Sequence, residues 1–289
     1  MKQRGACAAR RPSEEEIGLS EFDEGSREAS LKFRILYYPF MGTDINTERL
    51  ITLARICYAP LGVDELADLL QGRTWTDEQV GQFVRNLVES RHYGALEHWT
   101  TSFAVEGYSR ISSQQNDRHR LVTIFKDAGV VVNEPEQAST AVSQLQQSQR
   151  YVKERHFRYV MPPSIAAHPE LAAKFRRIQE EVQAFQNEGL RLKVPPEDLR
   201  FTLTNATETR FIITTNARQL RHMFNLRCCA RAQWEIRNLF NGLLAEYKRI
   251  APNIFYHAGA SCEEFGYCPE GKFSCGRAPT LAKLKGEHE

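Results

Sequence analysis

A short basic segment in the last third of the chain carries the side chains best suited to bind an anionic ligand. Arg218 and His222 are four residues apart, so they share one face if the segment is helical, and Arg227 lies next to that face. Asn216 precedes them where a helix cap is expected. Amide and guanidinium donors at a helix N-terminus suit an anionic or carbonyl-rich ligand, and a guanidinium can bind a heterocycle edge through two hydrogen bonds. The alternative is a solvated basic helix face.

Two further polar segments lie upstream of this one. Arg118-His119-Arg120, with Gln115 just before it, could bind a phosphate or a reduced flavin anion. Ser148-Gln149-Arg150 supplies a hydroxyl, backbone amides and a guanidinium, which together suit a phosphate. Exposed polar loops produce the same patterns, so neither segment defines a site by itself.

The histidines and cysteines are not spaced as in a common metal site. His92 and His98 match no standard zinc motif, and His92 is better explained as a structural side chain oriented by a carboxylate. The Gly-rich tail offers three thiols, where a structural zinc takes four ligands: Cys262, Cys268 and Cys275. We therefore expect no metal.

The elements that must position these residues are a few strands and several helices. β-branched and aromatic residues predict three strands: Leu31–Tyr37, Thr101–Val105 and Thr207–Thr215. Between the first two strands, Thr47 and Thr76 are expected to cap helices, with a short helix Asp64–Leu70 between them and Gly94 ending the unit.

Two longer helices are expected in the second half of the chain. The segment Pro163–Glu188 has an apolar stripe with Gly189 as a fitting C-cap: Leu171, Phe175, Ile178, Val182 and Phe185. Arg218–Tyr247 is predicted to be one long helix, and the chain from His257 an irregular tail. The predicted fold is α+β, with a small, mostly antiparallel sheet packed with several helices, including one long C-terminal helix.

The bulk composition narrows the class of protein. The 289 residues carry 38 basic and 36 acidic side chains, and a net charge of +2 does not argue for a nucleic-acid or membrane partner. No apolar run approaches the ~18 residues of a membrane span, and the polar N-terminus lacks a signal-peptide core. Seven cysteines, two of them adjacent, suit a reducing compartment, so we expect a soluble cytoplasmic protein. Residues 1–31 are expected to be a disordered leader, 32–277 the folded domain and 278–289 a flexible tail.

Taken together, these segments resemble the flavin-dependent thymidylate synthase family from about Leu36 to Arg277. The family hallmark is Arg-His-Arg, then seven residues, then Ser with Arg two positions further on. Arg118-His119-Arg120 matches its first half and Ser148-Gln149-Arg150-Tyr151 its second. Four other segments match in the same order: Glu97-His98, Glu106–Arg110, Asn216–Ile236 and Gly266–Lys272.

The chain departs from the family in the middle of the hallmark. Residues 121–147 separate its two halves, so Leu121–Thr140 forms an insertion or an artefact of the gene model, and either Thr123 or Ser143 takes the first Ser position. Asn116 and Asp117 also stand where the family usually has apolar residues. Three hypotheses follow: an active synthase, a flavin- or nucleotide-binding homologue whose catalysis the insertion after Arg120 impairs, or a non-enzymatic RNA-binding module.

The resemblance implies a methyltransferase that converts dUMP to dTMP with methylenetetrahydrofolate as carbon donor, FAD as cofactor and NADPH as flavin reductant. It implies Arg227 as the catalytic residue, and a homotetramer whose active sites are shared between subunits. The residues implied in binding dUMP are Gln115, Arg118, Gln146, Gln147, Ser148, Gln149, Arg150, Arg200 and Arg227. Those implied on the flavin side are Cys57, His92, Gly94, Arg118, His119, Arg120, Gln146, Asn216, Arg218 and His222.

Overall fold

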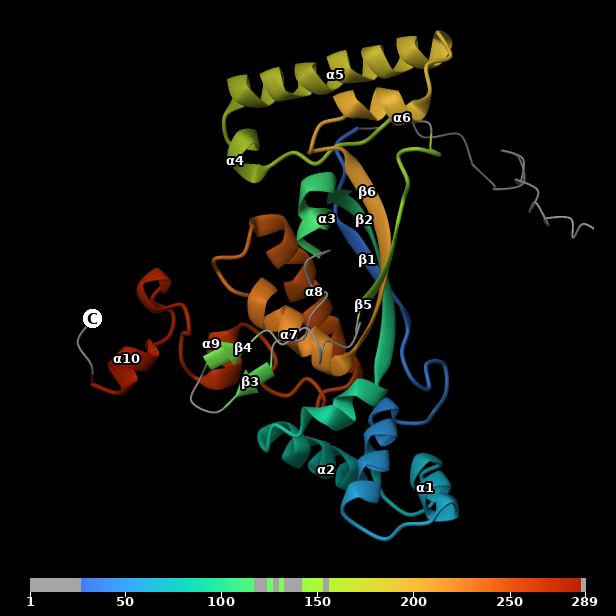
Figure 1. Ribbon diagram of the computed structural model, residues 1–289, viewed down its shortest axis with the longest axis vertical. Coiled ribbons are helices and arrows are strands. Elements are labelled where there is room, and N and C mark those ends of the chain that lie inside the picture. The colour runs from blue at the N-terminus through green and yellow to red at the C-terminus, as the bar shows by residue number, and fades with distance from the viewer. Residues whose placement is uncertain (1–26, 117–123, 127–129, 133–141, 153–155, 287–289) are drawn as a thin grey trace, which may run out of the picture.

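A four-stranded antiparallel sheet runs along the middle of the computed structural model (Figure 1), which describes residues 27–116, 124–126, 130–132, 142–152 and 156–286. Its strands lie in the order β1 (Lys32–Tyr37), β2 (Thr100–Ser109), β6 (Glu208–Asn216) and β5 (Val142–Gln146). All three pairs are antiparallel. The predicted α+β class, the antiparallel sheet and the three predicted strands are therefore confirmed.

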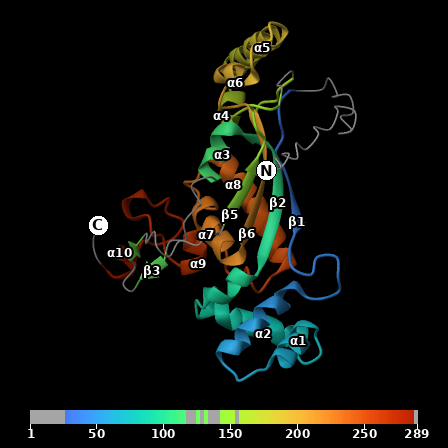
Figure 2. The same ribbon diagram turned by 45° about the vertical axis from the view of Figure 1, so that its right-hand side comes forward.

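The sheet buries one face against α7 (Ala217–Arg227) and α8 (Trp234–Ile250), as Figures 1 and 2 show. Side chains alternate along β2 and β6, so that Phe103 and Ile213 point into the core while their neighbours do not. The helices contribute Phe224 and Phe240, whose rings meet edge to face with centroids 6.1 Å apart. This core fixes α7, the predicted ligand-facing helix, on the sheet.

The predicted helix Arg218–Tyr247 is wrong as a single element, because the chain leaves the helix after Arg227 and α8 begins at Trp234. The side chain of Gln233 accepts hydrogen bonds from the backbone N–H groups of Glu235 and Ile236, which gives α8 its own N-cap. Apolar residues continue at helical spacing across the break, so periodicity alone does not reveal it.

A small helical group lies at the lower end of the sheet in Figure 1 and contains η1 (Thr47–Cys57), α1 (Val63–Leu70), α2 (Asp77–Glu89) and η2 (Tyr93–His98). The predicted cap Thr76 and the helix at Asp64–Leu70 are confirmed. The predicted cap Thr47 is wrong: Asn46 caps η1, a 3-10 helix, and the Thr47 hydroxyl instead accepts a hydrogen bond from Trp99 Nε1 at 2.8 Å. Gly94 lies within η2 rather than ending the preceding helix.

At the upper end of the sheet, the predicted helix Pro163–Glu188 is divided into α4 (Pro163–Ala166) and α5 (Pro169–Arg191), followed by α6 (Pro196–Leu199) and η4 (Arg200–Thr202). Gly189 is not the C-cap, which is Leu192; it lies inside α5, where a Cβ would come within 2.2 Å of a Leu199 methyl carbon. Glycine therefore permits a close contact here.

The apolar stripe predicted on α5 is largely exposed. Leu171, Ile178 and Phe185 keep about half of their surface, at 48%, 51% and 51%. The buried face of α5 is polar instead and consists mainly of Gln179, Gln183 and Gln186. These amides bind groups on neighbouring segments, so hydrogen bonding rather than hydrophobic packing sets which face of the helix turns inward.

The remaining described elements are short. α3 (Arg110–Asn116) follows β2 directly, while β3 (Ile124–Lys126) and β4 (Val130–Val132), which fall in the insertion, pair with each other in a separate two-stranded sheet. The tail contains α9 (Ser261–Phe265), η5 (Gly271–Phe273) and α10 (Leu281–Leu284).

The domain boundaries stay a prediction, and most of the expected leader lies outside the described residues. Its last part is described from Arg27, which donates to the Phe157 carbonyl, and Glu28, which forms an ion pair with Arg176 at 2.7 Å. In the part of the chain that the structure describes, no helix has the length and apolar character needed to cross a membrane.

Candidate active site

The predicted catalytic residue, Arg227, ends α7 and reaches α3. Its Nη2 donates a hydrogen bond to the backbone carbonyl of Gln115 at 3.2 Å. The structure thus brings together two predicted site residues that are far apart in the sequence. The side chain of Arg227 is only partly exposed, so this contact fixes one edge of the guanidinium in a sheltered position.

The end of β5 lies against the same helix. Gln146 Nε2 donates to the hydroxyl oxygens of Ser113, on α3, and Thr209, on β6, both at 2.9 Å. The next residue, Gln147, donates its backbone N–H to the Arg210 carbonyl at 2.9 Å. Gln146 and the Gln115–Arg227 pair therefore surround one short helix, α3.

A tight turn follows β5 and contains the predicted phosphate-binding residues Ser148, Gln149 and Arg150. The Ser148 hydroxyl accepts the backbone N–H of Arg150 at 3.3 Å. The Arg150 guanidinium lies over the Tyr151 ring and donates to its hydroxyl at 3.2 Å. Ser148 and Gln149 are partly exposed and Arg150 is exposed, so its guanidinium is accessible to an anion.

Two of the predicted groups are not among the residues placed around α3 here. Arg118, His119 and Arg120 lie outside the described residues. Arg200 lies on η4, beside α6 at the end of the molecule that α5 occupies, where its Nε donates to the Glu197 carbonyl at 3.1 Å (Figure 1).

The predicted flavin-side residues gather at the start of α7 and around η2. Asn216 is the N-cap of α7, with its side-chain oxygen accepting the Gln219 N–H at 2.9 Å. Arg218 forms an ion pair with Glu97 of η2. Gly94 is on the same 3-10 helix, and apart from its chain neighbours no atom of the described residues lies within 4 Å of the position that a Cβ would take. The start of α7 and η2 therefore form one surface with open space above Gly94.

Cys57 and His92 lie near the same surface. Cys57 is the last residue of η1, and the next residue, Tyr58, has its hydroxyl 3.1 Å from His92 Nδ1 with the two rings stacked. Cys57 is exposed. This contact links the end of η1 to the residue before η2.

Burial shifts the pKa of two groups near Arg227, namely His222 and Tyr108. It lowers the pKa of His222, and the charge of Arg227 lowers it further, while Glu264 opposes the change. His222 is therefore a neutral imidazole at neutral pH. Burial also raises the pKa of Tyr108, so that this residue keeps its hydroxyl proton; Arg227 acts in the opposite direction.

Sequence reasoning missed several buried polar residues that hold the site together. Glu235 accepts three hydrogen bonds from Ser109 and Ser112 at the junction of β2 and α3. Glu264, in the tail, forms a buried ion pair with Arg221 of α7 at 2.8 Å. Glu235 belongs to the matched segment Asn216–Ile236, so the signal was present, but a spacing pattern does not reveal which distant residues a carboxylate will contact.

A hollow of about 280 Å³ lies beside Arg227, between the end of α7 and the tail. Its lining includes Asn225, Arg231, Cys262 and Arg277. Within the ranges that the structure describes, no group of three or more His, Cys, Asp or Glu residues could hold a metal ion.

Comparison with known proteins assigns the family. A family described as "Thymidylate synthase complementing protein" matches residues 43–253. A flavin-dependent thymidylate synthase of Clostridium tetani is 37% identical over 256 residues, which cover 83% of this chain and 92% of the relative. Those of Nitratidesulfovibrio vulgaris and Geobacter sulfurreducens are 38% and 39% identical, over 78% and 80% of this chain and 87% and 89% of their own lengths.

The family match begins after β1. It includes the elements that carry the site: η1, η2, α3, β5, β6 and α7. The resemblance drawn from the sequence motifs is therefore confirmed. This chain belongs to the flavin-dependent thymidylate synthase family.

Proposed function

We propose that this chain catalyses the reductive methylation of dUMP to dTMP, with methylenetetrahydrofolate as carbon donor and FAD reduced by NADPH. The observation that carries the proposal is the anchoring of Arg227 on the Gln115 carbonyl, beside Gln146, in a chain of this family. The enzyme is a transferase that uses a flavin. Its relatives are flavin-dependent thymidylate synthases.

The residues at the start of α7 and on η2 have the chemistry to hold a flavin. Asn216 and Arg218 provide an amide and a guanidinium, and His222 is a neutral imidazole that can donate one hydrogen bond and accept another. The open space above Gly94 admits a ring or chain close to the backbone. When bound, the reduced flavin supplies the hydride. We assign Cys57, His92 and, beyond the described residues, His119 and Arg120 to the same site.

Arg227 is proposed to stabilise negative charge at the N3 and O2 positions of uracil. A guanidinium stays charged at every pH at which the protein is folded and can donate two parallel hydrogen bonds to a ring edge. The Gln115 contact fixes the plane of the guanidinium before substrate binds, so less orientation is lost on binding.

The remaining proposed dUMP ligands divide between the base and the phosphate. Gln146 is held by Ser113 and Thr209, so its amide is already oriented beside α3. Ser148 and Arg150 are the proposed phosphate ligands, because the turn presents a hydroxyl and an accessible guanidinium. The other proposed ligands are Gln115, Arg118, Gln147, Gln149 and Arg200.

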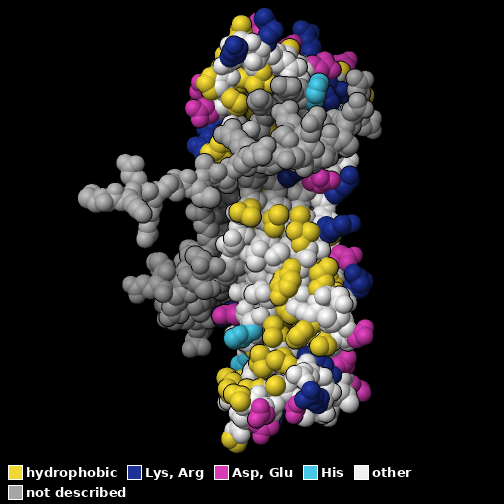
Figure 3. All heavy atoms as spheres, turned by 90° about the vertical axis from the view of Figure 1, so that its right-hand side faces the viewer, with side chains coloured by type: hydrophobic (Ala, Val, Ile, Leu, Met, Phe, Trp, Pro, Cys, Tyr) yellow, Lys and Arg dark blue, Asp and Glu magenta, His cyan; other side chains and the backbone are white. Residues whose placement is uncertain are grey.

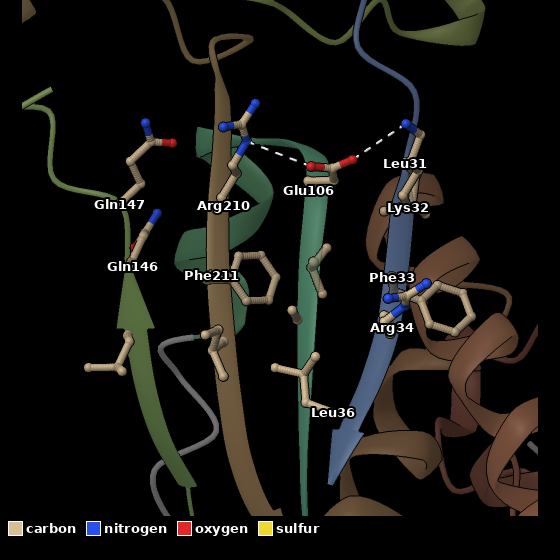
Figure 4. Close-up of a pocket in the computed structure, with 14 residues that line it drawn as sticks. Leu31, Lys32, Phe33, Arg34, Leu36, Glu106, Gln146, Gln147, Arg210 and Phe211 are labelled. Carbon is tan, nitrogen blue, oxygen red and sulfur yellow. Dashed lines mark ion pairs between the residues drawn. The ribbon is translucent and has the colours of Figure 1, made fainter. Parts of the chain in front are cut away.

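We propose a homotetramer in which neighbouring subunits complete each site. The face of the sheet away from α7 and α8 is hollowed, with a volume of about 900 Å³, and exposes Leu36, Leu145 and Ile212. Figure 3 shows hydrophobic side chains in a band along this side of the molecule, and Figure 4 shows Glu106 between Lys32 and Arg210 at one end of the hollow. An exposed apolar area of this kind supports contact with another subunit.

The position of Arg200 supports the same arrangement. It lies beside α6, whereas the Arg227 contact lies at α3, so a second subunit is the natural source of this guanidinium for a given site. The cytoplasmic location predicted from the sequence stays a prediction.

The insertion leaves β5, the strand that leads into the second half of the hallmark, paired in the sheet. β3 and β4 pair with each other, and β5 keeps its pairing with β6 from Val142↔Thr215 to Gln146↔Phe211. This arrangement favours an active enzyme over a homologue impaired by the insertion.

The proposal is tested by purifying the chain, recording its visible spectrum and measuring dTMP formation from dUMP with the folate and NADPH. A flavin band and dTMP are expected. Protein that stays colourless and binds no added FAD would overturn the proposal. The same assay on a deletion of Leu121–Thr140 distinguishes the alternative: equal activity in both forms excludes impairment by the insertion, and activity in the deletion alone supports it.

A further inference from the structure

We propose that Glu235, assisted by Gln233, is a positioning residue for the dUMP site, because it holds α3 in the place where the Gln115 carbonyl can anchor Arg227. This inference rests on the proposed function and extends it to a segment, Ala232–Ile236, that no role in binding or catalysis explains. Glu235 is 2% exposed and does not itself reach the substrate.

The Glu235 carboxylate binds the junction of β2 and α3 through three short hydrogen bonds. Its Oε1 accepts the backbone N–H of Ser109 at 2.6 Å. Its Oε2 accepts the hydroxyls of Ser109 and Ser112 at 2.5 and 2.6 Å. Gln233 Oε1 lies 3.2 Å from the Ser112 hydroxyl as a second acceptor, while it also caps α8. The N-terminus of α8 thus holds the first turn of α3 from two side chains.

The contact continues through α3 to the catalytic residue. Ser112 is in the first turn of α3 and Gln115 is in the next, so a rigid helical turn joins the Glu235 contact to the Gln115 carbonyl. Arg227 and Gln233 are in turn the two ends of the connection between α7 and α8. α3 therefore contacts both ends of that connection, Arg227 through Gln115 and Gln233 through Ser112.

The Glu235 carboxylate orients the serine residues that donate hydrogen bonds to it. Among the ion pairs of the described residues, none includes Glu235, so its charge is balanced by three donors rather than by a cation. Hydrogen bonds to a buried carboxylate are strong and directional, and they allow few alternative positions of their donors. A purely apolar contact would hold α3 with less angular precision.

The chain offers a matched control in Glu48. It is 1% exposed and also accepts three hydrogen bonds, from the N–H groups of Asn253 and Ile254 and from the Asn253 amide. Glu48 joins η1 to the segment after α8 and makes none of these contacts with α3. Replacement of either carboxylate by Gln removes the same charge from an equally buried site.

The test compares Glu235→Gln with Glu48→Gln in the full-length protein. For Glu235→Gln we expect the Kd and KM for dUMP to rise about tenfold, the loss typical of one hydrogen bond to a charged group. The Kd for FAD should stay within about twofold, because Gly94, Asn216 and Arg218 on the flavin side lie on η2 and at the start of α7, away from the Glu235 contact. Glu48→Gln should leave the Kd and KM for dUMP unchanged, although its loss of thermal stability should be similar to that of Glu235→Gln.

If Glu235→Gln does not fold, Ser112→Ala tests the same contact with less disturbance, since Glu235 keeps both bonds from Ser109, and a rise of about fivefold in the dUMP constants is expected. Equal behaviour of the Glu235 and Glu48 variants, or a parallel loss of FAD and dUMP binding, would overturn the positioning role. A wild-type chain that binds dUMP but makes no dTMP contradicts the proposed function while the Kd comparison still decides the role of Glu235. A wild-type chain that binds no dUMP overturns both.

Discussion

Arg227 contacts α3 through a backbone carbonyl, that of Gln115. A carbonyl is a neutral acceptor that helps to fix the plane of the guanidinium. The neighbouring His222 and Tyr108 are both kept uncharged by burial. At this scale, the proposed site combines one fixed cation with neutral hydrogen-bonding groups.

His222 gives a prediction about pH. Its pKa in the folded protein is below the ordinary value of 6.5, so the unfolded chain takes up the proton first as the pH falls. The stability that neutral His222 contributes is complete above about pH 6.5 and is lost as the pH falls through the folded-state pKa. We expect His222→Asn to make the free energy of unfolding less dependent on pH between about 7.5 and 5.5. Denaturant titrations at both pH values measure this, and identical pH dependence in the two proteins would contradict it.

Asn116 gives a prediction about stability. It is 1% exposed, and neither atom of its amide has a hydrogen-bond partner among the described residues. The Tyr108 hydroxyl is also buried and lies near Asn116 and Ser112, but no hydrogen bond of normal geometry reaches it from the described residues. Asn116→Leu keeps the shape and removes the unpaired polar group, so the free energy of unfolding should rise by about 1 kcal/mol. Chemical denaturation checks this, and a loss of stability would mean that the amide is bonded in solution.

At the scale of elements, the strands and the capped helix α2 could be predicted because their signals are local. Alternating apolar residues mark β6, and Thr76 with Gln79 marks the start of α2. The break between α7 and α8 could not be predicted, because it depends on the Gln233 side chain turning back onto its own helix. The inward face of α5 could not be predicted either, since Gln186 and its neighbours bind segments that only the folded chain brings near.

The same division applies to the site. Gln115, Gln146 and Arg227 could be predicted from motifs, and the structure places them around α3. The Glu235 contact could not be assigned a purpose from spacing, because its partners are more than a hundred residues away. Motifs predict the groups proposed to touch a ligand better than those that hold these groups in place.

The exposed stripe on α5 predicts a subunit contact. Leu171, Phe175, Ile178, Val182 and Phe185 alternate spacings of four and three, which is the pattern of a helix that packs against another helix. Ile178→Glu should weaken such a contact by about 2 kcal/mol per interface, roughly thirtyfold in the dissociation constant. Light scattering after size exclusion should then show a smaller particle mass than for the wild type.

A matched control is Ala173→Glu, which adds the same charge to an exposed position of α5 away from the stripe. Its particle mass should equal that of the wild type. A wild-type mass of one chain, or an unchanged mass for Ile178→Glu, would contradict the subunit contact.

At the scale of the whole molecule, the sheet separates two different surfaces, the proposed active site and the proposed subunit contact. One face is covered by α7, which carries proposed flavin and uracil contacts, and by α8. The other face exposes apolar residues over a hollow (Figures 1 and 3). Arg200 lies at the end of the molecule beside α5. An assembly that covers the apolar face would also bring such distant groups to a neighbour's site.

The most direct test of the central claim is tritium release from 5-tritiated dUMP, measured for the wild type and for Arg227→Lys at equal FAD content. Lysine keeps the charge but cannot donate two parallel bonds to a ring edge, so release should fall by about a hundredfold with the flavin spectrum unchanged. Release by the wild type together with this loss is the predicted result. Undiminished release from Arg227→Lys would contradict the role of Arg227, and no release from flavin-loaded wild type would contradict the proposed reaction.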